Sequence, residues 1–260
     1  MKMDYEKILA IAREAALTAG NYLKENFDRK PAIEYKSAIE LVTERDRESQ
    51  QIIYQIIKKH FPNHSILGEE DLDEVEEKDL LWMIDPIDGT TNFAHSLPIF
   101  SVSIAFLVEG KTQVGVVFAP ILGEMFYTIR GGGAFLDKKQ IHVSQEKDLR
   151  KSLLCTGFPY DIRESENNNL NHFNKFVLQA LAVRRLGSAA IDLCYTAAGR
   201  LDGFWELKLK PWDTAAAFLM VEEAGGIVTD FSNKPFDPLM KECLASNSLI
   251  HSQMLEIIDR

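Results

Sequence analysis

The sequence has little that would mark a secreted, membrane-embedded or disulfide-rich protein. Its 260 residues include three cysteines, Cys155, Cys194 and Cys243, with no C-x-x-C spacing. An odd number of scattered thiols favours reduced cysteines in a cytoplasmic chain. No apolar run approaches the roughly 18 residues of a membrane span, and the N-terminal segment is amphipathic rather than signal-like. We therefore expect a cytoplasmic protein with no membrane partner.

Several catalytic motifs are also missing. The histidines and cysteines form no C-x-x-C zinc motif, which argues against a zinc site. There is no G-x-S-x-G segment, no Rossmann fingerprint and no Walker A loop. Positive charge is scarce, because 29 lysines and arginines face 39 acidic residues and give a net charge of -10. Such a chain would repel a nucleic-acid backbone, so we expect no nucleic-acid partner.

The most informative stretch that is present covers residues 80–93, L-L-W-M-I-D-P-I-D-G-T-T-N-F. Its five apolar residues predict a buried strand that ends at Asp85, because the proline that follows has no N–H for a strand ladder. Asp88 and Gly89 predict a turn, and the threonines behind them suit a cap. Two carboxylates thus stand at a strand end beside backbone N–H groups that could face an anion. The alternative is an ordinary turn with solvated aspartates.

The first half of the chain predicts two helices and a set of strands. Helical periodicity covers residues 4–28 and 44–60, with an irregular or hairpin segment between them that holds Lys36. Thr43 is the predicted N-cap of the second helix, so Asp46 would close a capping box and has a purely structural interpretation. Strands are predicted at 65–68, 80–84, 101–108, 113–118 and 125–129, the last three as an antiparallel meander. The glycines at 131–133 predict a tight turn rather than a phosphate loop.

The second half alternates strands and helices. The predicted strands are 153–157, 182–186, 202–206, 227–229 and 243–246, and the predicted helices are 170–180, 188–198, 211–224 and 248–259. This order predicts a layered α/β or α+β architecture. No long linker is visible, so we expect an N-terminal part, 1–145, and a C-terminal part, 146–260, that pack as one compact unit.

Four carboxylates fall at predicted element ends, namely Glu69, Asp85, Asp88 and Asp213. An oxygen-only ligand set favours magnesium, manganese or calcium. At a separation of ~4 Å and an effective dielectric constant of ~20, each pair of charges would repel by about 4 kcal/mol, so the group would need roughly two divalent cations. Spacing in the sequence does not show that these side chains meet.

Several motifs in a fixed order give a more specific indication. They are L-V-T-E-R-D, G-E-E, W-M-I-D-P-I-D-G-T-T-N-F, R-R-L-G-S-A-A-I-D-L-C and P-W-D-T-A-A-A-F. Across nearly the whole chain this set resembles the inositol monophosphatase family, and its bacterial members in particular. The resemblance implies an α-β-α-β-α sandwich, a fold shared with fructose-1,6-bisphosphatase. It also implies a magnesium-dependent, lithium-sensitive phosphatase that forms a homodimer.

Carried over by position, the resemblance implies roles for individual residues. The implied metal ligands are Glu69, Asp85, the Ile87 carbonyl, Asp88 and Asp213. The implied catalytic residues are Thr90 and Asp46, which would orient the attacking water, and Glu70, an outer-shell or third-metal contact. The implied phosphate and substrate contacts are Gly89, Thr90, Gly187, Ser188, Ala189, Glu206 and Lys36. The implied cofactor is two or three Mg²⁺ ions, with Mn²⁺ or Ca²⁺ able to occupy the same sites.

The implied reaction is hydrolysis of myo-inositol 1-phosphate to inositol and phosphate by a metal-activated water. A small phosphorylated polyol or sugar is thus the expected partner. Related families act on fructose 1,6-bisphosphate, 3′-phosphoadenosine 5′-phosphate, histidinol phosphate or the 2′-phosphate of NADP, and these substrates remain alternatives. Residues that would set the choice are Lys36, Arg184, Arg185, Glu206 and Lys210. A further alternative is a non-catalytic, metal-stabilised regulatory protein on the same fold.

Overall fold

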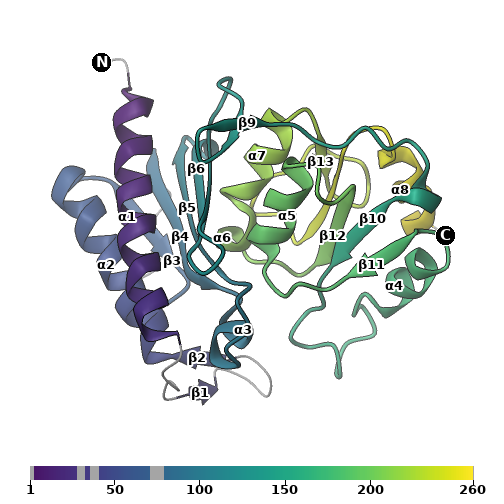
Figure 1. Cartoon of the computed structure of the whole chain (residues 1–260), viewed down its shortest axis with the longest axis horizontal. Helices are drawn as coiled ribbons and strands as arrows, with labels where there is room; N and C mark the ends of the chain where they lie inside the picture. Colours follow the sequence, from purple (N-terminus) through teal and green to yellow (C-terminus); the bar gives the residue numbers. More distant parts are fainter. Residues whose placement is uncertain (1–2, 28–32, 36–40, 71–78, 260) are drawn as a thin grey trace.

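The computed structural model describes residues 3–27, 33–35, 41–70 and 79–259, and its elements stack in five layers, α-β-α-β-α (Figure 1). The outer helices α1 (Tyr5–Asn26) and α2 (Glu44–His60) cover one face of the first sheet. Helices α5 (Ala189–Ala197) and α7 (Ala217–Glu223) lie between the two sheets. Helices α4 (Leu170–Val177) and α8 (His251–Asp259) cover the far face of the second sheet. The predicted layered sandwich is therefore confirmed.

The first sheet has seven strands in the order β3-β4-β5-β6-β7-β8-β9. They are β3 (Ser65–Gly68), β4 (Leu80–Asp88), β5 (Ser101–Val108), β6 (Lys111–Ala119), β7 (Glu124–Ile129), β8 (Ala134–Leu136) and β9 (Lys139–Ile141). Strand β3 runs parallel to β4, and each later neighbour pairs antiparallel, which confirms the predicted meander. The glycines at 131–133 form the turn before β8. The sequence interpretation did not predict the short hairpin β8–β9.

Helix α1 packs on the first sheet through a stripe of small residues, Ala12, Ala15, Ala16 and Ala19, all of them fully buried. Gly20 continues this stripe, and a Cβ there would lie 2.4 Å from the Phe118 ring, so only glycine lets the helix come this close. Helix α2 has the predicted bounds and begins at the predicted Thr43 cap. Ahead of it, β1 (Ile33–Tyr35) pairs with β2 (Leu41–Thr43), as expected for a hairpin segment. The predicted contact residue Lys36 lies outside the described residues.

The second sheet has five strands in the order β11-β10-β12-β14-β13. They are β10 (Leu153–Thr156), β11 (Ala182–Arg184), β12 (Gly203–Leu207), β13 (Ile227–Thr229) and β14 (Glu242–Ser246), preceded by a 3₁₀ turn, η1 (Leu149–Lys151). Strand β10 is parallel to β11 and β12, whereas β14 is antiparallel to β12 and β13. The parallel strands direct the ends of β10 and β12 toward the same edge, where the pocket described below is found.

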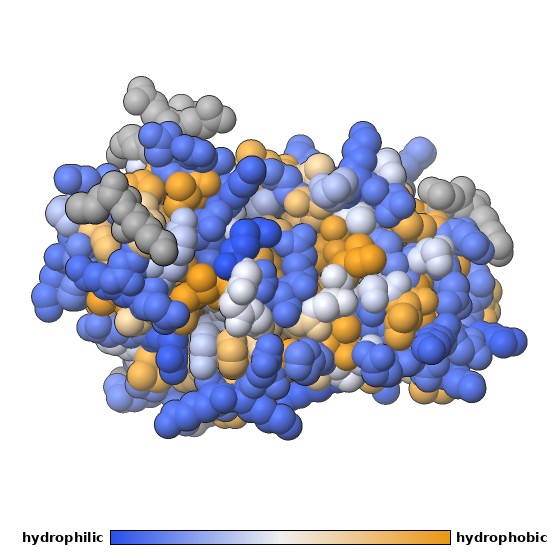
Figure 2. Space-filling view, turned by 90° about the horizontal axis from the view of Figure 1, so that it is seen from above, coloured by the Kyte–Doolittle hydropathy of each residue, from blue (hydrophilic) through white to orange (hydrophobic). Residues whose placement is uncertain are grey.

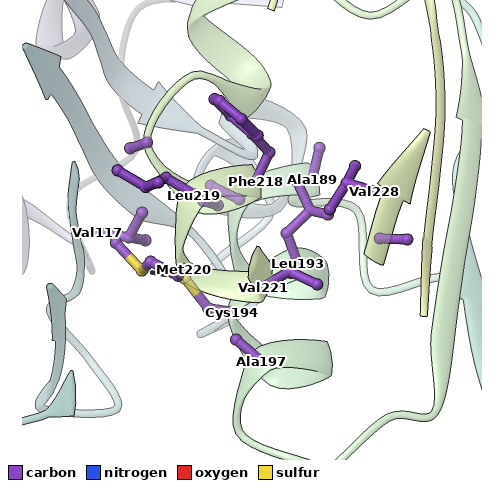
Figure 3. Packing of buried hydrophobic residues seen from close by; sticks show 14 of the residues in the cluster. Val117, Ala189, Leu193, Cys194, Ala197, Phe218, Leu219, Met220, Val221 and Val228 are labelled. Carbon is purple, nitrogen blue, oxygen red and sulfur yellow. Dashed lines mark hydrogen bonds between the residues drawn. The ribbon is translucent and has the colours of Figure 1, made fainter. Parts of the chain in front are cut away.

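The middle layer is the apolar contact between the two sheets. Leu193 and Cys194 of α5 and Met220 and Val221 of α7 face one another in this layer, with Val117 of β6 on one side (Figure 3). The helix predicted at 211–224 is instead divided into α6 (Pro211–Thr214) and α7. The division lies where the Ala216 carbonyl approaches Gly115 of β6, at which a Cβ would be only 2.4 Å from that oxygen.

Strand β4 differs from its prediction. It continues past Asp85 to Asp88, because a bulge between these two residues accommodates Pro86 while β5 stays paired on both sides. Gly89, with a φ of 100°, then turns the chain and is the N-cap of α3 (Thr90–Ala94), so Thr90 is the first helical residue rather than the cap. Two of the predicted acids are thereby fixed in a distorted strand end that ordinary extended backbone would not supply.

The surface seen from above is mostly hydrophilic, with hydrophobic residues in small separate patches (Figure 2). The three cysteines are free and buried. None of the helices in the described part of the chain has the length and apolar character needed to cross a membrane.

Candidate active site

A cavity of about 880 Å³ opens between the two halves of the chain, at the ends of β3, β4, β10 and β12 and at the starts of α3, α5 and α6. Its walls include all four carboxylates whose convergence the sequence left open, Glu69, Asp85, Asp88 and Asp213. They reach the cavity from three separate segments of the chain. The structure therefore brings together residues up to 144 positions apart, since 213 − 69 = 144.

The bulge in β4 orients the first of these acids. Asp85 is 2% exposed, and its Oδ1 accepts a hydrogen bond of 3.0 Å from the Ile87 N–H. The Ser49 hydroxyl of α2 donates to the Pro86 carbonyl at 3.0 Å, which ties the bulge to the outer helix. The bulge is thus fixed from both sides, and the Asp85 carboxylate stays directed toward the cavity that it lines.

Asp46 makes both of the contacts considered for it, one with Thr43 and one with Thr90. Its Oδ2 accepts from the Thr43 N–H at 2.8 Å and from the Thr43 hydroxyl at 2.7 Å, which confirms the capping box. Its Oδ1 lies 3.0 Å from the Thr90 hydroxyl, which is also 3.0 Å from the Ile87 carbonyl. A threonine hydroxyl has a single proton, so it donates to one of these two oxygens at a time. The cap thereby holds Asp46 in place for its partner at the cavity.

The end of β3 is held by a side chain of α2. Gln50 accepts from the Glu70 N–H at 3.0 Å through its Oε1 and donates to the Glu70 carbonyl through its Nε2. This paired contact positions Glu69 and Glu70 where β3 ends, and both line the cavity. Glu70 is 3% exposed, and its charge helps to raise the pKa of Asp46 to about 6, after burial as the main cause.

Asp88 connects the two halves of the protein. Its carboxylate accepts from the N–H groups of Ala189 at 3.1 Å and Ala190 at 3.0 Å, which are the first two residues of α5. The Ser188 hydroxyl donates to it as well, as does the Ser101 hydroxyl of β5 at 3.2 Å. Burial raises the pKa of Asp88 to about 6 although these donors oppose the shift. The Ala189 N–H, part of a segment implied to contact substrate, is thus already bonded to Asp88.

Asp213 enters the cavity from the first turn of α6. Its Oδ2 accepts from the Lys210 N–H at 2.7 Å, so this carboxylate caps the helix that carries it. Pro211 at the helix start fixes the backbone angle and leaves no N–H unpaired there. The Ser103 hydroxyl of β5 donates to the Trp212 carbonyl at 3.4 Å, which anchors α6 to the first sheet.

The electrostatics show that these acids face one another. Burial raises the pKa of Asp85 well above its usual value, and the charges of Glu69, Asp88 and Asp213 raise it further. Burial also raises the pKa of Asp213, with Asp88 and Glu69 adding to the shift and the Lys210 N–H opposing it. Mutual repulsion of buried carboxylates is the condition that a divalent cation relieves, and oxygen donors suit Mg²⁺ or Mn²⁺. The donor set therefore fits such ions.

Within the described ranges, no group of three or more His, Cys, Asp or Glu side chains is placed closely enough to hold a metal ion. The acidic residues instead form a more open group that lines the cavity. Magnesium usually keeps several waters and takes only one or two carboxylates, so an open group of this kind is compatible with it.

The opposite wall comes from the second half of the chain. Of the residues implied to contact substrate, Gly187, Ser188, Ala189 and Glu206 line the cavity. Gly89 reaches this wall directly, because a Cβ on it would lie 3.1 Å from the Gly187 carbonyl. Asn92 of α3 donates to the Leu186 carbonyl at 2.7 Å and holds the two walls together. Arg184, one of the candidates for setting substrate choice, is not among the cavity-lining residues, whereas Arg185 and Lys210 are.

Among the cavity-lining residues that sequence reasoning missed are Arg47, Phe158, Tyr160 and Asp192. Phe158 and Tyr160 follow β10, and the Arg185 guanidinium lies over the Phe158 ring at 5.1 Å from its centroid. Asp192 had a usable signal, since it is a lone acid within the apolar run A-A-I-D-L-C. The others had none, because nothing local distinguishes them from ordinary surface or core residues.

Known proteins resemble this chain over its whole length. A family model described as the inositol monophosphatase family matches residues 4–260. The inositol-1-monophosphatase of Synechocystis is 43% identical over 258 residues, covering 98% of this chain and 90% of that protein. The Nus factor SuhB of Escherichia coli K12 is 41% identical over 251 residues, covering 95% of this chain and 94% of that protein. The solved inositol monophosphatase of Anabaena superposes with a TM-score of 0.90 at 41% identity, covering 99% of this chain and 97% of that one.

Proposed function

The chain belongs to the inositol monophosphatase family, and from that premise we propose that it is a metal-dependent phosphomonoesterase acting on a small phosphorylated polyol, with myo-inositol 1-phosphate as the first candidate. The observation that carries the proposal is the convergence of Glu69, Asp85, Asp88 and Asp213 on one cavity beside the Asp46–Thr90 pair. Carboxylates for cations and a positioned hydroxyl are the two requirements of metal-assisted hydrolysis.

The residues that would hold the cations are Glu69, Asp85, the Ile87 carbonyl, Asp88 and Asp213, with Glu70 as an outer contact. When bound, divalent cations neutralise the charge of the phosphate and lower the pKa of a water molecule in their coordination shell. We take Mg²⁺ as the physiological ion. Lithium inhibition, which the family resemblance implies, belongs to the same proposal.

Thr90 and Asp46 would handle the proton of the attacking water. The Thr90 hydroxyl can donate to Asp46, which leaves its oxygen free to accept from water at the cavity. Asp46 itself is kept rigid by the Thr43 contacts at its other oxygen. A hydroxyl whose direction is fixed in this way orders the nucleophile before the reaction, so no reorganisation is needed at the transition state.

The phosphate and the leaving alcohol would occupy the two walls. The Gly89 and Thr90 N–H groups, at the bend after β4, are proposed to receive the phosphate oxygens, with Lys36 as a further candidate. Glu206 and the backbone of Gly187, Ser188 and Ala189 are proposed to contact the hydroxyl groups of the alcohol. In that arrangement the bond that breaks lies between the proposed cation ligands and the wall that contains residues 187–189 and Glu206.

A regulatory binding role is the second candidate, because several relatives at 41–43% identity are named Nus factor SuhB. Such a role does not require a chain to retain the acidic wall, the Asp46–Thr90 pair and the cavity together. All three are present here, which favours the enzyme. The two roles are also compatible, since a binding surface elsewhere on the molecule would leave the cavity free.

The homodimer implied by the resemblance remains a proposal, and so does a cytoplasmic location. One surface that suits a second copy is the outer side of α4 and the segment after it, where Leu178 is 85% exposed and Leu181 is 66% exposed. Strand β11, next to this segment, is an edge of its sheet. Analytical ultracentrifugation tests the proposal, and a monomer at high protein concentration contradicts it.

Phosphate release from myo-inositol 1-phosphate tests the proposed function. We expect turnover with added Mg²⁺ and its loss with EDTA, followed by recovery when excess Mg²⁺ is restored. A panel with fructose 1,6-bisphosphate, 3′-phosphoadenosine 5′-phosphate, histidinol phosphate and NADP at one magnesium concentration then ranks the alternatives by kcat/KM. Absence of turnover on every phosphomonoester, with Mg²⁺ or Mn²⁺ present, contradicts the proposal and favours the regulatory role.

A further inference from the structure

A second pair of carboxylates, which are not among the proposed cation ligands, lines the same cavity. Asp192 is in the first turn of α5 and is 1% exposed, and Glu206 is on β12. Glu206 packs directly against Gly157, where a Cβ would lie 2.0 Å from Glu206 Oε1. Glycine at position 157 therefore leaves the space that the Glu206 carboxylate occupies. Both acids line the cavity on the wall assigned to the leaving alcohol.

Asp192 has an unsatisfied oxygen. Throughout the residues that the structure describes, its Oδ1 finds no hydrogen-bond partner, although the atom is buried. Burying a polar atom without a partner costs free energy, and nearly all such atoms in native proteins are paired. The exceptions call for an explanation, and a ligand that supplies the missing partner is one. Asp192 lines the cavity, so a ligand bound there would lie next to this side chain.

The helix does not need Asp192 for its own stability. The N-terminal N–H groups of α5 already have acceptors. Those of Ala189 and Ala190 donate to Asp88, and that of Ile191 donates to the Ser188 hydroxyl at 3.4 Å. The neighbours of Asp192 do not balance its charge either. The Cys155 thiol lowers the pKa of Asp192 by hydrogen bonding, but burial raises it well above its usual value and the charge of Asp88 adds to that shift.

Asp192 also acts on Glu206. Burial raises the pKa of Glu206 well above its usual value, the charges of Asp192 and Asp88 raise it further, and the charge of Arg185, which also lines the cavity, opposes the shift. Two neighbouring carboxyl groups in one wall of a cavity favour the state in which one of them keeps a proton. Such a pair offers both a donor and acceptors. A hydroxyl group also combines one donor with two acceptor positions, so a polyol matches this pair in a way that an apolar alcohol does not.

We propose that Asp192 is a specificity-determining residue, which together with Glu206 binds neighbouring hydroxyl groups of the leaving alcohol and so selects hydroxyl-rich phosphomonoesters. The inference rests on the proposed phosphatase function, because it assigns the alcohol side of the same cavity. It adds to that function a residue that acts on substrate choice rather than on the attack at phosphorus.

The test compares two substrates in each variant, with Mg²⁺ present. They are myo-inositol 1-phosphate, which has a hydroxyl-rich leaving group, and 4-nitrophenyl phosphate, whose leaving group has no free hydroxyl. For Asp192→Leu we expect KM for inositol 1-phosphate to rise about tenfold or more, while kcat/KM for 4-nitrophenyl phosphate stays within about threefold, because only the hydroxyl contacts are lost. For Asp192→Asn, which keeps the shape, we expect a smaller change in the same direction.

Thermal unfolding separates this role from a structural one. Because Asp192 has a buried oxygen without a partner, Asp192→Leu should unfold at the same or a higher temperature than the wild type. The matched control is Thr196→Val, one turn further along α5, where a buried hydroxyl donates to the Asp192 carbonyl and does not line the cavity. This control should leave the ratio of the two substrates unchanged.

Equal losses on both substrates in the Asn and Leu variants, or an unchanged substrate ratio, would overturn the assignment. If Asp192→Leu does not fold, the substrate ratio of Asp192→Asn decides the question alone. Wild-type hydrolysis of 4-nitrophenyl phosphate with none of inositol 1-phosphate would leave the phosphatase function standing and overturn the hydroxyl-binding role. Failure of the wild type on both substrates would instead contradict the proposed function itself.

Discussion

Asp85 and Asp88 lie three residues apart at the end of the same strand, yet the protein surrounds them differently. Asp88 accepts hydrogen bonds from two N–H groups of α5 and from the hydroxyls of Ser188 and Ser101. Asp85 accepts one from the Ile87 N–H within its own bulge, and its electrostatic neighbours are Glu69 and other acids. The comparison separates two uses of a buried acid. Asp88 is part of the scaffold as well as of the site, whereas the charges that act most strongly on Asp85 in the described part of the chain are all acidic.

The largest expected effect is on activity, from Asp85→Asn. At ~4 Å and an effective dielectric constant of ~20, a pair of unit charges attracts by about 4 kcal/mol, so losing one carboxylate charge beside a divalent cation costs at least that much, which corresponds to a rate loss of about 1000-fold or more. The metal-free variant should nevertheless be at least as stable as the wild type at neutral pH, because a buried repulsion is removed. Steady-state kinetics and urea unfolding in EDTA measure the two effects. Near-normal turnover at saturating Mg²⁺ contradicts the assignment of Asp85 as a cation ligand.

Thr90→Ala comes next, and it tests the hydroxyl between the two acids. The variant keeps the backbone N–H but loses the contact with Asp46 at 3.0 Å. We expect kcat to fall about 100-fold with little change in KM, because the hydroxyl acts on the water in the chemical step. Thr90→Ser, which restores a hydroxyl, should recover most of kcat. A change confined to KM would assign Thr90 to substrate binding instead.

Asp88→Asn should lower the stability of the metal-free protein, whereas Asp85→Asn should not. An amide replaces one acceptor oxygen with an NH₂ group, which faces donors of Ser188 and α5. Losing hydrogen bonds to a charged acceptor costs about 2–3 kcal/mol, so this variant should be less stable than the wild type in EDTA as well as less active. Urea unfolding of Asp85→Asn and Asp88→Asn side by side measures the contrast. Equal stability of the two variants contradicts the scaffold role of Asp88.

Much of this arrangement could be predicted from the sequence, where the signal was local. The Thr43–Asp46 capping box and the bounds of α2 follow from neighbouring residues, and the structure has both. The bulge at Pro86 and the division between α6 and α7 could not be predicted in this way. Both depend on contacts with distant segments, the first with Ser49 and the second with Gly115.

The cavity residues also differ in whether they could be predicted from their neighbours in the sequence. The sequence identifies Asp85 and Asp88 as acids at a strand end, but only the family resemblance and then the fold relate them to Asp213. The bonding of Asp88 to α5 was not foreseeable, because its donors lie about 100 residues away. Asp192 is an intermediate case, since an acid in an apolar helix is visible in the sequence while its unpartnered oxygen is not.

The smallest expected effect concerns Asp46, whose pKa burial raises to about 6. An ordinary aspartate titrates near 3.9 when unfolded, so the native state binds the extra proton between these two values. The stabilising contribution of Asp46 is therefore fully present below about pH 4 and is lost as the pH rises through 6. His251 has the opposite influence, since burial lowers its pKa to about 4 and its neutral state favours the fold at higher pH.

Because the two groups oppose each other, the informative quantity is the difference in unfolding free energy between Asp46→Asn and the wild type, measured in EDTA at several pH values. The amide side chain of this variant cannot ionise, so the difference should shift in favour of the variant by about 2 kcal/mol between pH 4.5 and 7.5. Asn92→Ala, which removes an uncharged side chain from the same site, should show a constant difference. A constant difference for Asp46→Asn as well would mean that Asp46 is ionised throughout this range, and that its contacts with Thr43 and Thr90 outweigh its burial.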